Sequence, residues 1–295
     1  MGKARHGRYP PELSVAMQNN GKNTGRGQRP PPVKHYNVYG DKPEIDADGD
    51  GDSGIIEGRN PVIEALRAKV AIDKVFIANE ESDTALRYIA SSARAAGAAV
   101  VNADRRKLDQ MSVTHAHQGV IAVAACAEYA TICDILETAA DRNEKPLIVL
   151  CDEISDPHNL GAIIRTCEAS GAHGVVVPKR RSAGLTATVA KASSGAVYHT
   201  AVARVSNLTA TIGELKKAGV WVFGAVGRSD TSLWQADFKV PTAFVIGSEG
   251  AGISRLVEEN CDFKVSIPML GKLASLNASV SAAILLYEAV RQRQM

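Results

Sequence analysis

The chain has 295 residues, 45% of them hydrophobic, so it is long enough for two ordinary domains with sizeable cores. A formal net charge of +2 is too small to identify a polyanion-binding protein by itself. The five cysteines include no CxxC pair, which argues against a disulfide framework and a zinc site and favours a reducing cytoplasm. No apolar run reaches the roughly 18 residues of a membrane span, and there is no signal-peptide core, so we expect a soluble cytoplasmic protein without a bound metal.

Residues 1–54 are rich in Pro, Gly, Asn and charge, which predicts a disordered extension. Its first part is basic and is either a nucleic-acid-binding arm or a solvated tail. Its acidic part matches the ligand pattern of a calcium loop at Asp46, Asp48, Asp50, Gly51 and Glu57. Because Gly40 and Pro43 interrupt the entering helix that such a loop requires, we do not expect calcium binding.

Residues 55–127 alternate between helical and strand patterns, which predicts a small α/β domain. The expected helices cover 60–68, 84–97 and 107–111, and the expected strands cover 74–79, 98–103 and 119–125. Residues 128–145 read as a linking helix and loop.

From residue 146 to residue 295 the strands are longer and continuously apolar, which favours a parallel, doubly wound sheet with helices on both faces. The expected strands cover 147–152, 174–178, 199–204, 220–226, 243–247 and 263–268, and a closing helix covers 277–292. Ligands of such sheets bind beyond the carboxyl ends of the strands.

Polar residues gather after three of these strands, in segments 152–174, 244–254 and 266–283, so their loops are expected to converge on one rim. The second segment resembles a dinucleotide fingerprint, but its glycines have the reversed spacing G-x-x-G-x-G. Glu249 lies where a pyrophosphate would need only backbone amides. A ligand with a positive centre, such as S-adenosylmethionine, suits this loop better.

Together the three segments resemble the three motifs of the SpoU/TrmH family of RNA ribose 2′-O-methyltransferases, in the SPOUT superfamily. The matching stretches are DPHNLGAIIRTCEASG, FVIGSEGAGIS and IPMLGKLASLNASVSAAILLYE. The segment IIEGRNPVIEAL and the small unit after it resemble the ribosomal-protein-like (L30e-like) RNA-binding domain of bacterial 23S rRNA guanosine methyltransferases in this family. The resemblance implies a trefoil-knotted α/β domain, a homodimer, S-adenosylmethionine as cofactor and RNA, namely 23S rRNA, as substrate.

The resemblance also assigns cofactor contacts, made mainly by the backbone. They fall on Gly247, Ile267 and Leu276, and on Ala225 in the neighbouring loop. A glycine allows backbone to approach adenosine closely because no Cβ intervenes. The side chains of Ile267 and Leu276 are equally compatible with core packing.

The catalytic positions that the resemblance implies are Asn159, Arg165, Glu249, Ser275 and Asn277. Taken singly, each has a structural explanation. Asn159 and Ser275 are possible helix caps, and Arg165 is a possible ion-pair partner of Glu168 or Glu249. In the catalytic reading, the two asparagines hold the ribose, Ser275 contacts the nucleotide or braces Arg165, and Glu249 orients Arg165 from behind.

Arg165 is unsuited to be a literal base, because neutralising a guanidinium at pH 7 costs upward of about 7 kcal/mol. We expect it to clamp the target phosphate and stabilise the developing alkoxide, with the proton passing to phosphate or water. His158 is an alternative base with a suitable ordinary pKa, but it is not a motif position.

Several basic elements are candidates for RNA contact or are simply solvated: Arg59, Arg105, Arg106, Lys107, Lys179, Arg180 and Arg181. Three other functions stay open: a tRNA ribose methyltransferase, a non-catalytic RNA-binding protein of the same fold, and a nucleotide-dependent oxidoreductase with a degenerate glycine loop.

Overall fold

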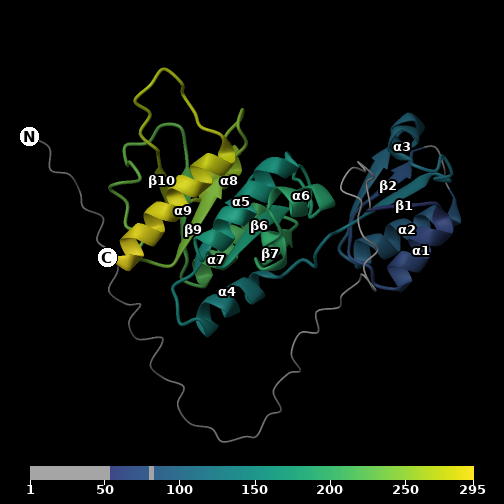
Figure 1. Ribbon diagram of the computed structural model, residues 1–295, viewed down its shortest axis with the longest axis horizontal. Helices are drawn as coiled ribbons and strands as arrows, with labels where there is room; N and C mark the ends of the chain where they lie inside the picture. The colour runs from purple at the N-terminus through teal and green to yellow at the C-terminus, as the bar shows by residue number, and fades with distance from the viewer. Residues whose placement is uncertain (1–53, 80–82) are drawn as a thin grey trace, which may run out of the picture. The chain divides into compact units, whose positions relative to one another are not determined.

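The computed structural model of the chain describes residues 54–79 and 83–295 (Figure 1). The predictions for the basic arm and for most of the acidic calcium-like pattern therefore lie outside the described residues. Glu57, the last position of that pattern, lies in a strand, and its carboxylate accepts hydrogen bonds from Ser112 and Thr114. Among the described residues, no helix is long and apolar enough to cross a membrane.

The first sheet contains four strands in the order β1-β4-β2-β3. Its strands are β1 (Ile55–Glu57), β2 (Ile72–Ala78), β3 (Ala99–Ala103) and β4 (Val120–Ala124). β2 pairs with β3 in parallel, whereas β4 runs antiparallel to both β1 and β2. The helices and strands predicted for this region are all present, and β1 is additional.

Helices cover both faces of this first sheet. Successive β2 side chains point to opposite faces, and each face contributes to its own hydrophobic core. Val75 and Ile77 pack with residues of α1 (Arg59–Arg67) and α2 (Thr84–Ala95). Phe76 and Ala78 pack with Leu108 of α3 (Arg105–Met111) on the other face. α3 therefore lies opposite α1 and α2.

The second sheet contains six strands in the order β10-β8-β9-β5-β6-β7, and every pair is parallel, as predicted. Its strands are β5 (Leu147–Cys151), β6 (Gly174–Pro178), β7 (Val202–Val205), β8 (Trp221–Ala225), β9 (Thr242–Ile246) and β10 (Phe263–Val265). β7 begins at Val202, later than the predicted residue 199, and a short 3₁₀ helix at Ala196–Tyr198 precedes it.

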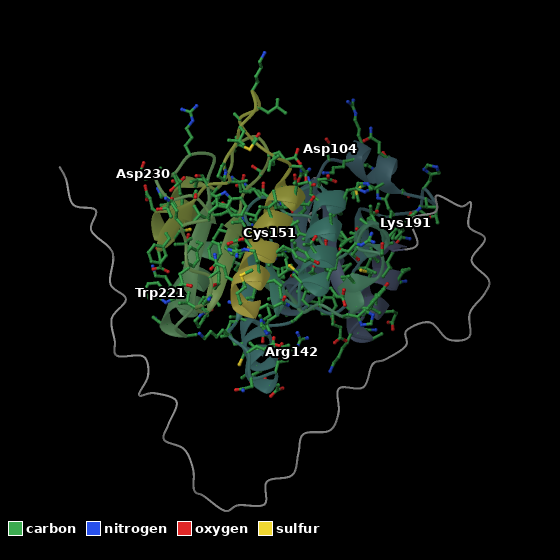
Figure 2. The ribbon with its side chains drawn as sticks, turned by 60° about the vertical axis from the view of Figure 1, so that its left-hand side comes forward. Asp104, Arg142, Cys151, Lys191, Trp221 and Asp230 are labelled. Carbon is green, nitrogen blue, oxygen red and sulfur yellow. The ribbon has the colours of Figure 1, made fainter. Side chains whose placement is uncertain are left out.

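Helices lie on both faces of the second sheet, which confirms a doubly wound architecture. In β5, Val149 and Cys151 face the core shared with α5 (Pro157–Ala169), α6 (Ala187–Ala192) and α9 (Ala278–Gln294). Ile148 and Leu150 face the core shared with α4 (Ile132–Asp141), α7 (Leu208–Lys217) and α8 (Arg255–Asn260). Figure 1 shows α5 beside α9, and Figure 2 labels Cys151 in the interior.

A buried ion pair joins β2 of the first sheet to β7 of the second. The Arg204 guanidinium binds the Asp73 carboxylate and donates to the carbonyl oxygen of Gly97 at 2.7 Å. It also lies 4.1 Å from the ring centroid of Tyr129, whose hydroxyl donates to Asp73 at 2.6 Å. The side chains of Arg204 and Asp73 are only 7% and 2% exposed. Water therefore cannot replace either partner.

Replacing Arg204 with alanine should destabilise the protein strongly, because the charge of Asp73 would stay buried with only the Tyr129 hydroxyl and the more distant Lys74 Nζ, 3.9 Å away, to offset it. We expect the free energy of unfolding in urea to fall by about 3–5 kcal/mol. The exposed pair of Arg255 with Glu259 on α8 offers a control. Arg255→Ala should change stability little; equal losses for the two variants would contradict a special contribution from the buried pair.

Candidate active site

Three loops at the carboxyl ends of the second sheet are joined by a hydrogen-bond network. The Asn159 side-chain amide donates to Glu249 Oε1 at 2.8 Å, and that of Asn277 donates to Asn159 Oδ1 at 2.9 Å. Asn277 also donates to Glu249 Oε1. Asn159 is 90 residues from Glu249 and 118 from Asn277 along the chain. Folding therefore brings one residue from each of the three polar segments into direct contact.

Local helix capping places these side chains. Asp156 is the N-cap of α5 and accepts from His158 N at 3.0 Å, with Pro157 following it, so Asn159 is not the cap. The N-cap of α9 is Asn277, not Ser275: its Oδ1 accepts from Ser279 N at 2.9 Å and from Val280 N at 3.3 Å. The explanation of Asn159 and Ser275 as helix caps is thus wrong.

Asn277 therefore uses both ends of its side chain. Its Oδ1 caps the closing helix, while its Nδ2 reaches the other two segments. Because the cap fixes the amide plane, the amide hydrogens point at Asn159 and Glu249 without further adjustment. The start of α9 and the rim of the sheet are positioned by one residue.

Arg165 has a partner that the sequence does not predict. Its Nη1 donates to Ser194 Oγ at 3.0 Å, and neither Glu168 nor Glu249 forms an ion pair with it. Glu249 is held by the two asparagines instead, so it does not orient Arg165 from behind.

Ser194 follows α6 in a left-handed conformation, with φ 51°, and Gly195 continues it with φ 83°. Close packing of α6 on α5 makes this contact possible. A Cβ on Gly161 of α5 would lie 2.5 Å from the Cβ of Ala192, so only glycine allows this approach. The only local signal for Ser194 is the pair Ser-Gly after a short helix, which is too common to identify a functional residue.

The residues expected to hold the cofactor lie at neighbouring strand ends. Ala225 ends β8, Gly247 follows β9, and Ile267 follows β10 by two residues. Since β8 lies between β9 and β10, these three positions are adjacent. Leu276 directly precedes Asn277, and all four residues are half-buried. This uncharged, half-buried edge beside the Glu249 carboxylate fits a bulky cationic nucleoside.

Gly247 is required for a reason other than the predicted approach to adenosine. A Cβ there would lie 2.1 Å from the carbonyl carbon of Gly252. The 248–252 turn closes on itself, with Ser248 N donating to Gly252 O at 3.0 Å and Gly252 N to Ser248 O at 2.9 Å. The turn is further tied to β5 by Asp152, a buried carboxylate that accepts from Ser254 N at 2.6 Å. Asp152 is a second positioning residue outside the predicted set.

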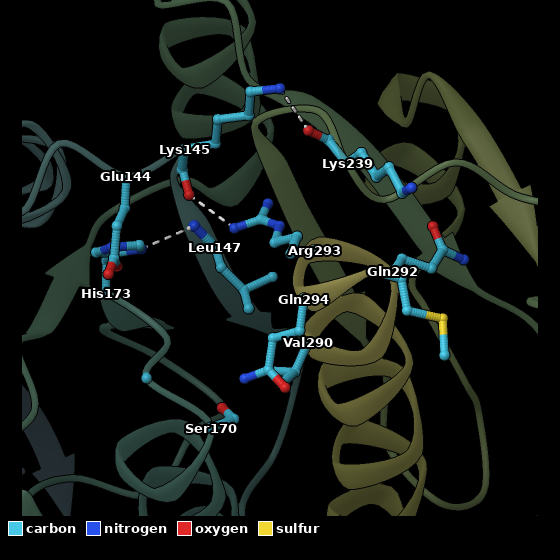
Figure 3. A pocket seen from close by; sticks show the side chains of 12 residues that line it. Glu144, Lys145, Leu147, Ser170, His173, Lys239, Val290, Gln292, Arg293 and Gln294 are labelled. Atoms are coloured by element: carbon cyan, nitrogen blue, oxygen red, sulfur yellow. Dashed lines mark hydrogen bonds and ion pairs between the residues drawn. The ribbon is translucent and has the colours of Figure 1, made fainter.

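A cavity of about 570 Å³ lies elsewhere, at the amino ends of the strands, and is shown in Figure 3. Its walls include Leu147, His173 and Lys239 near the starts of β5, β6 and β9, and Arg293 of α9. Burial lowers the pKa of His173, whose Nδ1 accepts from Leu147 N at 3.0 Å. Arg293 donates to the carbonyl oxygens of Lys145 and Pro146. The polar side chains of His173 and Arg293 are thus bonded to backbone groups of the cavity wall, and neither residue belongs to the three motifs.

Comparison with known proteins identifies the class to which this fold and site belong. Residues 146–287 match the model described as the SpoU rRNA Methylase family, and residues 55–130 match that described as RNA 2'-O ribose methyltransferase substrate binding. These matches define the class as RNA methyltransferases that use S-adenosylmethionine. The chain belongs to the SpoU rRNA methylase family, which confirms the resemblance and removes the oxidoreductase alternative.

Similar proteins come from several bacteria. YacO of Bacillus subtilis, named as a TrmH family tRNA/rRNA methyltransferase, is 47% identical over 236 residues, which cover 80% of this chain and 94% of the relative. A similarly named protein of Staphylococcus haemolyticus is 44% identical over 81% of this chain and 96% of its own. The structure of the SpoU methyltransferase AviRb from Streptomyces viridochromogenes in complex with AdoMet is 28% identical, with a TM-score of 0.51, over 81% of this chain and 90% of that chain.

Asn277→Ala should have two separable effects. Loss of the α9 cap should lower the free energy of unfolding by about 0.5–2 kcal/mol, and loss of the network should weaken S-adenosylmethionine binding measured by calorimetry. Asn207 is a matched control, because it caps α7 by accepting from Thr209 N and Ala210 N and lies outside the network. Asn207→Ala should lose similar stability and keep cofactor affinity. Equal loss of affinity in both variants would show that the network does not shape the pocket.

Proposed function

We propose that this protein methylates the 2′-hydroxyl of a ribose in RNA, and that its target is a guanosine of 23S rRNA. The observation that supports this most directly is the Asn159–Glu249–Asn277 network, which unites the three family motifs at one rim. The match of residues 55–130 to a substrate-binding model for RNA 2'-O ribose methyltransferases supports the ribose as acceptor.

The residues of the rim divide into two sets. The backbone of Gly247, Ile267 and Leu276, with Ala225 beside them, holds S-adenosylmethionine. When bound, this cofactor supplies an electrophilic methyl group on a sulfonium ion. Asn159 and Asn277 fix the geometry of the loops, and Glu249 holds both amides because its Oε1 accepts from each. Asn277 uses both of its amide hydrogens within the network, so the second amide hydrogen of Asn159 is the one that holds the ribose. Ser275, exposed on the loop before α9, contacts the nucleotide.

Arg165 acts on the phosphate and on the developing negative charge of the ribose oxygen. Its guanidinium is exposed and already oriented by Ser194, so it can bind a phosphate without a change of rotamer. Because a guanidinium does not lose its proton at neutral pH, the hydroxyl proton passes to phosphate or water. Ser194 thus positions Arg165 and need not touch the substrate.

The active unit is proposed to be a homodimer in which both chains complete each site. On α9, Val280 and Tyr287 are 45% and 50% exposed, with Ile284 half-buried between them, so an apolar stripe at helical spacing faces outward. Arg165 lies six residues beyond Asn159 on α5, about 9 Å along the helix axis. This separation is consistent with Arg165 serving the site of a second copy. The trefoil knot and a cytoplasmic location belong to the same proposal.

Mass-spectrometric mapping of ribose methylation in cells lacking this protein tests the substrate. We expect one 2′-O-methylguanosine to disappear from 23S rRNA and to return when the gene is restored. A loss from tRNA instead would move the assignment to the tRNA alternative, which the names of the relatives leave open. Unchanged methylation in both RNAs would favour the non-catalytic RNA-binding alternative.

Substitution of Arg165 tests the proposed mechanism. Arg165→Ala should abolish almost all methyl transfer, while Arg165→Lys should keep part of it, most visibly at raised pH, because an ammonium retains the charge but not the planar fork. The readout is the pH profile of kcat on an unmodified 23S rRNA transcript. Full activity of Arg165→Ala would remove this residue from the mechanism.

Ser194→Gly offers a matched variant. Glycine accepts the left-handed backbone at position 194 without strain, so the melting temperature should stay equal or rise. Loss of the hydroxyl should nevertheless lower kcat, because Arg165 is no longer oriented. A fall in stability together with kcat would instead indicate a structural role for the serine.

A further inference from the structure

The loop of residues 112–118, between α3 and β4, is exposed but is fixed by many hydrogen bonds. We call it the 112–118 loop. The Glu57 carboxylate accepts from the hydroxyls of Ser112 and Thr114 and from the backbone amides of Val113 and Thr114. Ser112 Oγ in turn accepts from His115 N at 2.9 Å. One strand residue thus fixes the first half of the loop.

Glu57 is suited to hold this loop because it stays ionised. Burial raises its pKa, but the hydrogen bonds from Ser112, Thr114 and the Val113 backbone outweigh burial and lower the pKa to about 2. A carboxyl whose pKa is depressed on folding stabilises the fold above its unfolded value, here 4.5, and loses that contribution as pH falls toward 2. The anchor therefore persists throughout the neutral range.

The second half of the loop is fixed by different contacts. His117 is buried; its Nδ1 accepts from Gly119 N at 3.0 Å, and its Nε2 lies 2.9 Å from Asp109 Oδ1 on α3. Arg59 Nε donates to the carbonyl oxygen of Gln118 at 3.1 Å. The loop is consequently bound to β1, α1 and α3.

The backbone of the loop is strained. His115 and Gln118 have φ of 57° and 49°, a left-handed conformation that is uncommon outside glycine. Strain of this kind persists only where surrounding contacts impose it, and it concentrates at functional sites. The result of these contacts is an exposed surface and not a core: the Val113 side chain is 67% exposed, and His115 is also at the surface.

Positive charge lies at the other end of α3, about 10 Å along the helix axis from the loop. The exposed residues Arg105, Arg106 and Lys107 form the first turn of α3, after Asp104, which caps the helix and is labelled in Figure 2. Lys107 also lies 5.3 Å from the ring centroid of Phe76, which limits its freedom. An apolar side chain and an imidazole at one end of a helix, with cations at its other end, are complementary to a short unpaired RNA segment. Its bases need an apolar or planar surface and its phosphates need cations.

We propose that the 112–118 loop is the RNA-binding element of the small unit, with Val113 and His115 contacting an unstacked base and the first turn of α3 contacting the adjacent phosphates. This inference rests on the proposed function, because it takes RNA as the substrate. It extends that function by assigning RNA recognition to particular residues within the region matched to substrate binding.

The test uses the full chain with Val113→Ser and His115→Asn. Neither should disturb the fold, since Val113 is exposed and asparagine tolerates a left-handed backbone. The probes are unmodified 23S rRNA and tRNA transcripts. Each variant should weaken binding roughly ten-fold and raise the KM for RNA, with kcat and S-adenosylmethionine affinity unchanged. Arg106→Gln should reduce the slope of log affinity against log salt by about 1.

Tyr88→Ser is the matched control, because Tyr88 is 50% exposed on α2, on the opposite face of the sheet. It should bind both transcripts as the parent does. Parent-like RNA affinity and KM in both loop variants, or an equal loss in Tyr88→Ser, would overturn the loop assignment while leaving methyl transfer intact. If the parent protein bound RNA through this loop but methylated neither transcript, the proposed function would be contradicted and the RNA-binding role of the loop supported. A parent that bound no RNA would overturn both.

Discussion

A single carboxylate oxygen holds the rim of the catalytic sheet together. Glu249 Oε1 accepts from both Asn159 and Asn277, and Asn277 also donates to Asn159. Each of the three residues follows a different strand, so the network is possible only because parallel strands direct all their carboxyl ends to one edge. It also depends on capping, since the Asn277 side chain that starts α9 is the one that crosses to the other loops. The edge formed by Ala225, Gly247 and Ile267, where we propose that the cofactor binds, lies at the same end of the sheet.

The chain uses the same device, a carboxylate that gathers several donors, at two other places. Asp73 holds Arg204 and Tyr129 where the two sheets meet, and Glu57 holds the 112–118 loop. The environments differ and so do the consequences. The buried pair of Asp73 and Arg204 concerns stability, because removing either partner leaves a charge without water. Glu57 instead organises an exposed loop whose strained backbone is not compensated by packing into a core. Strain of this kind concentrates at functional sites, which supports a role of the loop in RNA recognition.

For several predicted site residues, the structure gives a different physical explanation from the one expected from the sequence. Gly247 was expected to admit adenosine, yet its missing Cβ is already required by the turn that brings Gly252 against it. Arg165 was expected beside a glutamate, yet it binds Ser194 across the close contact of α5 and α6. In both cases the deciding neighbour is set by packing between segments that sequence spacing does not relate.

Sequence alone determined every strand of the two sheets except β1, the parallel arrangement of the second sheet and the three polar segments. Apolar periodicity and local motifs depend on residues close together in the chain, which is why they can be recognised without the structure. Sequence also determined the family, because the three motifs that contain Asn159, Glu249 and Asn277 occur along the chain in the order typical of the family. Only the tertiary structure decided which of these residues touch, that Asp156 and Asn277 are the caps, and that Ser194, Asp152 and Glu57 do positioning work. Such contacts join residues distant in the chain, and their geometry depends on how helices and strand ends pack, which no local pattern encodes.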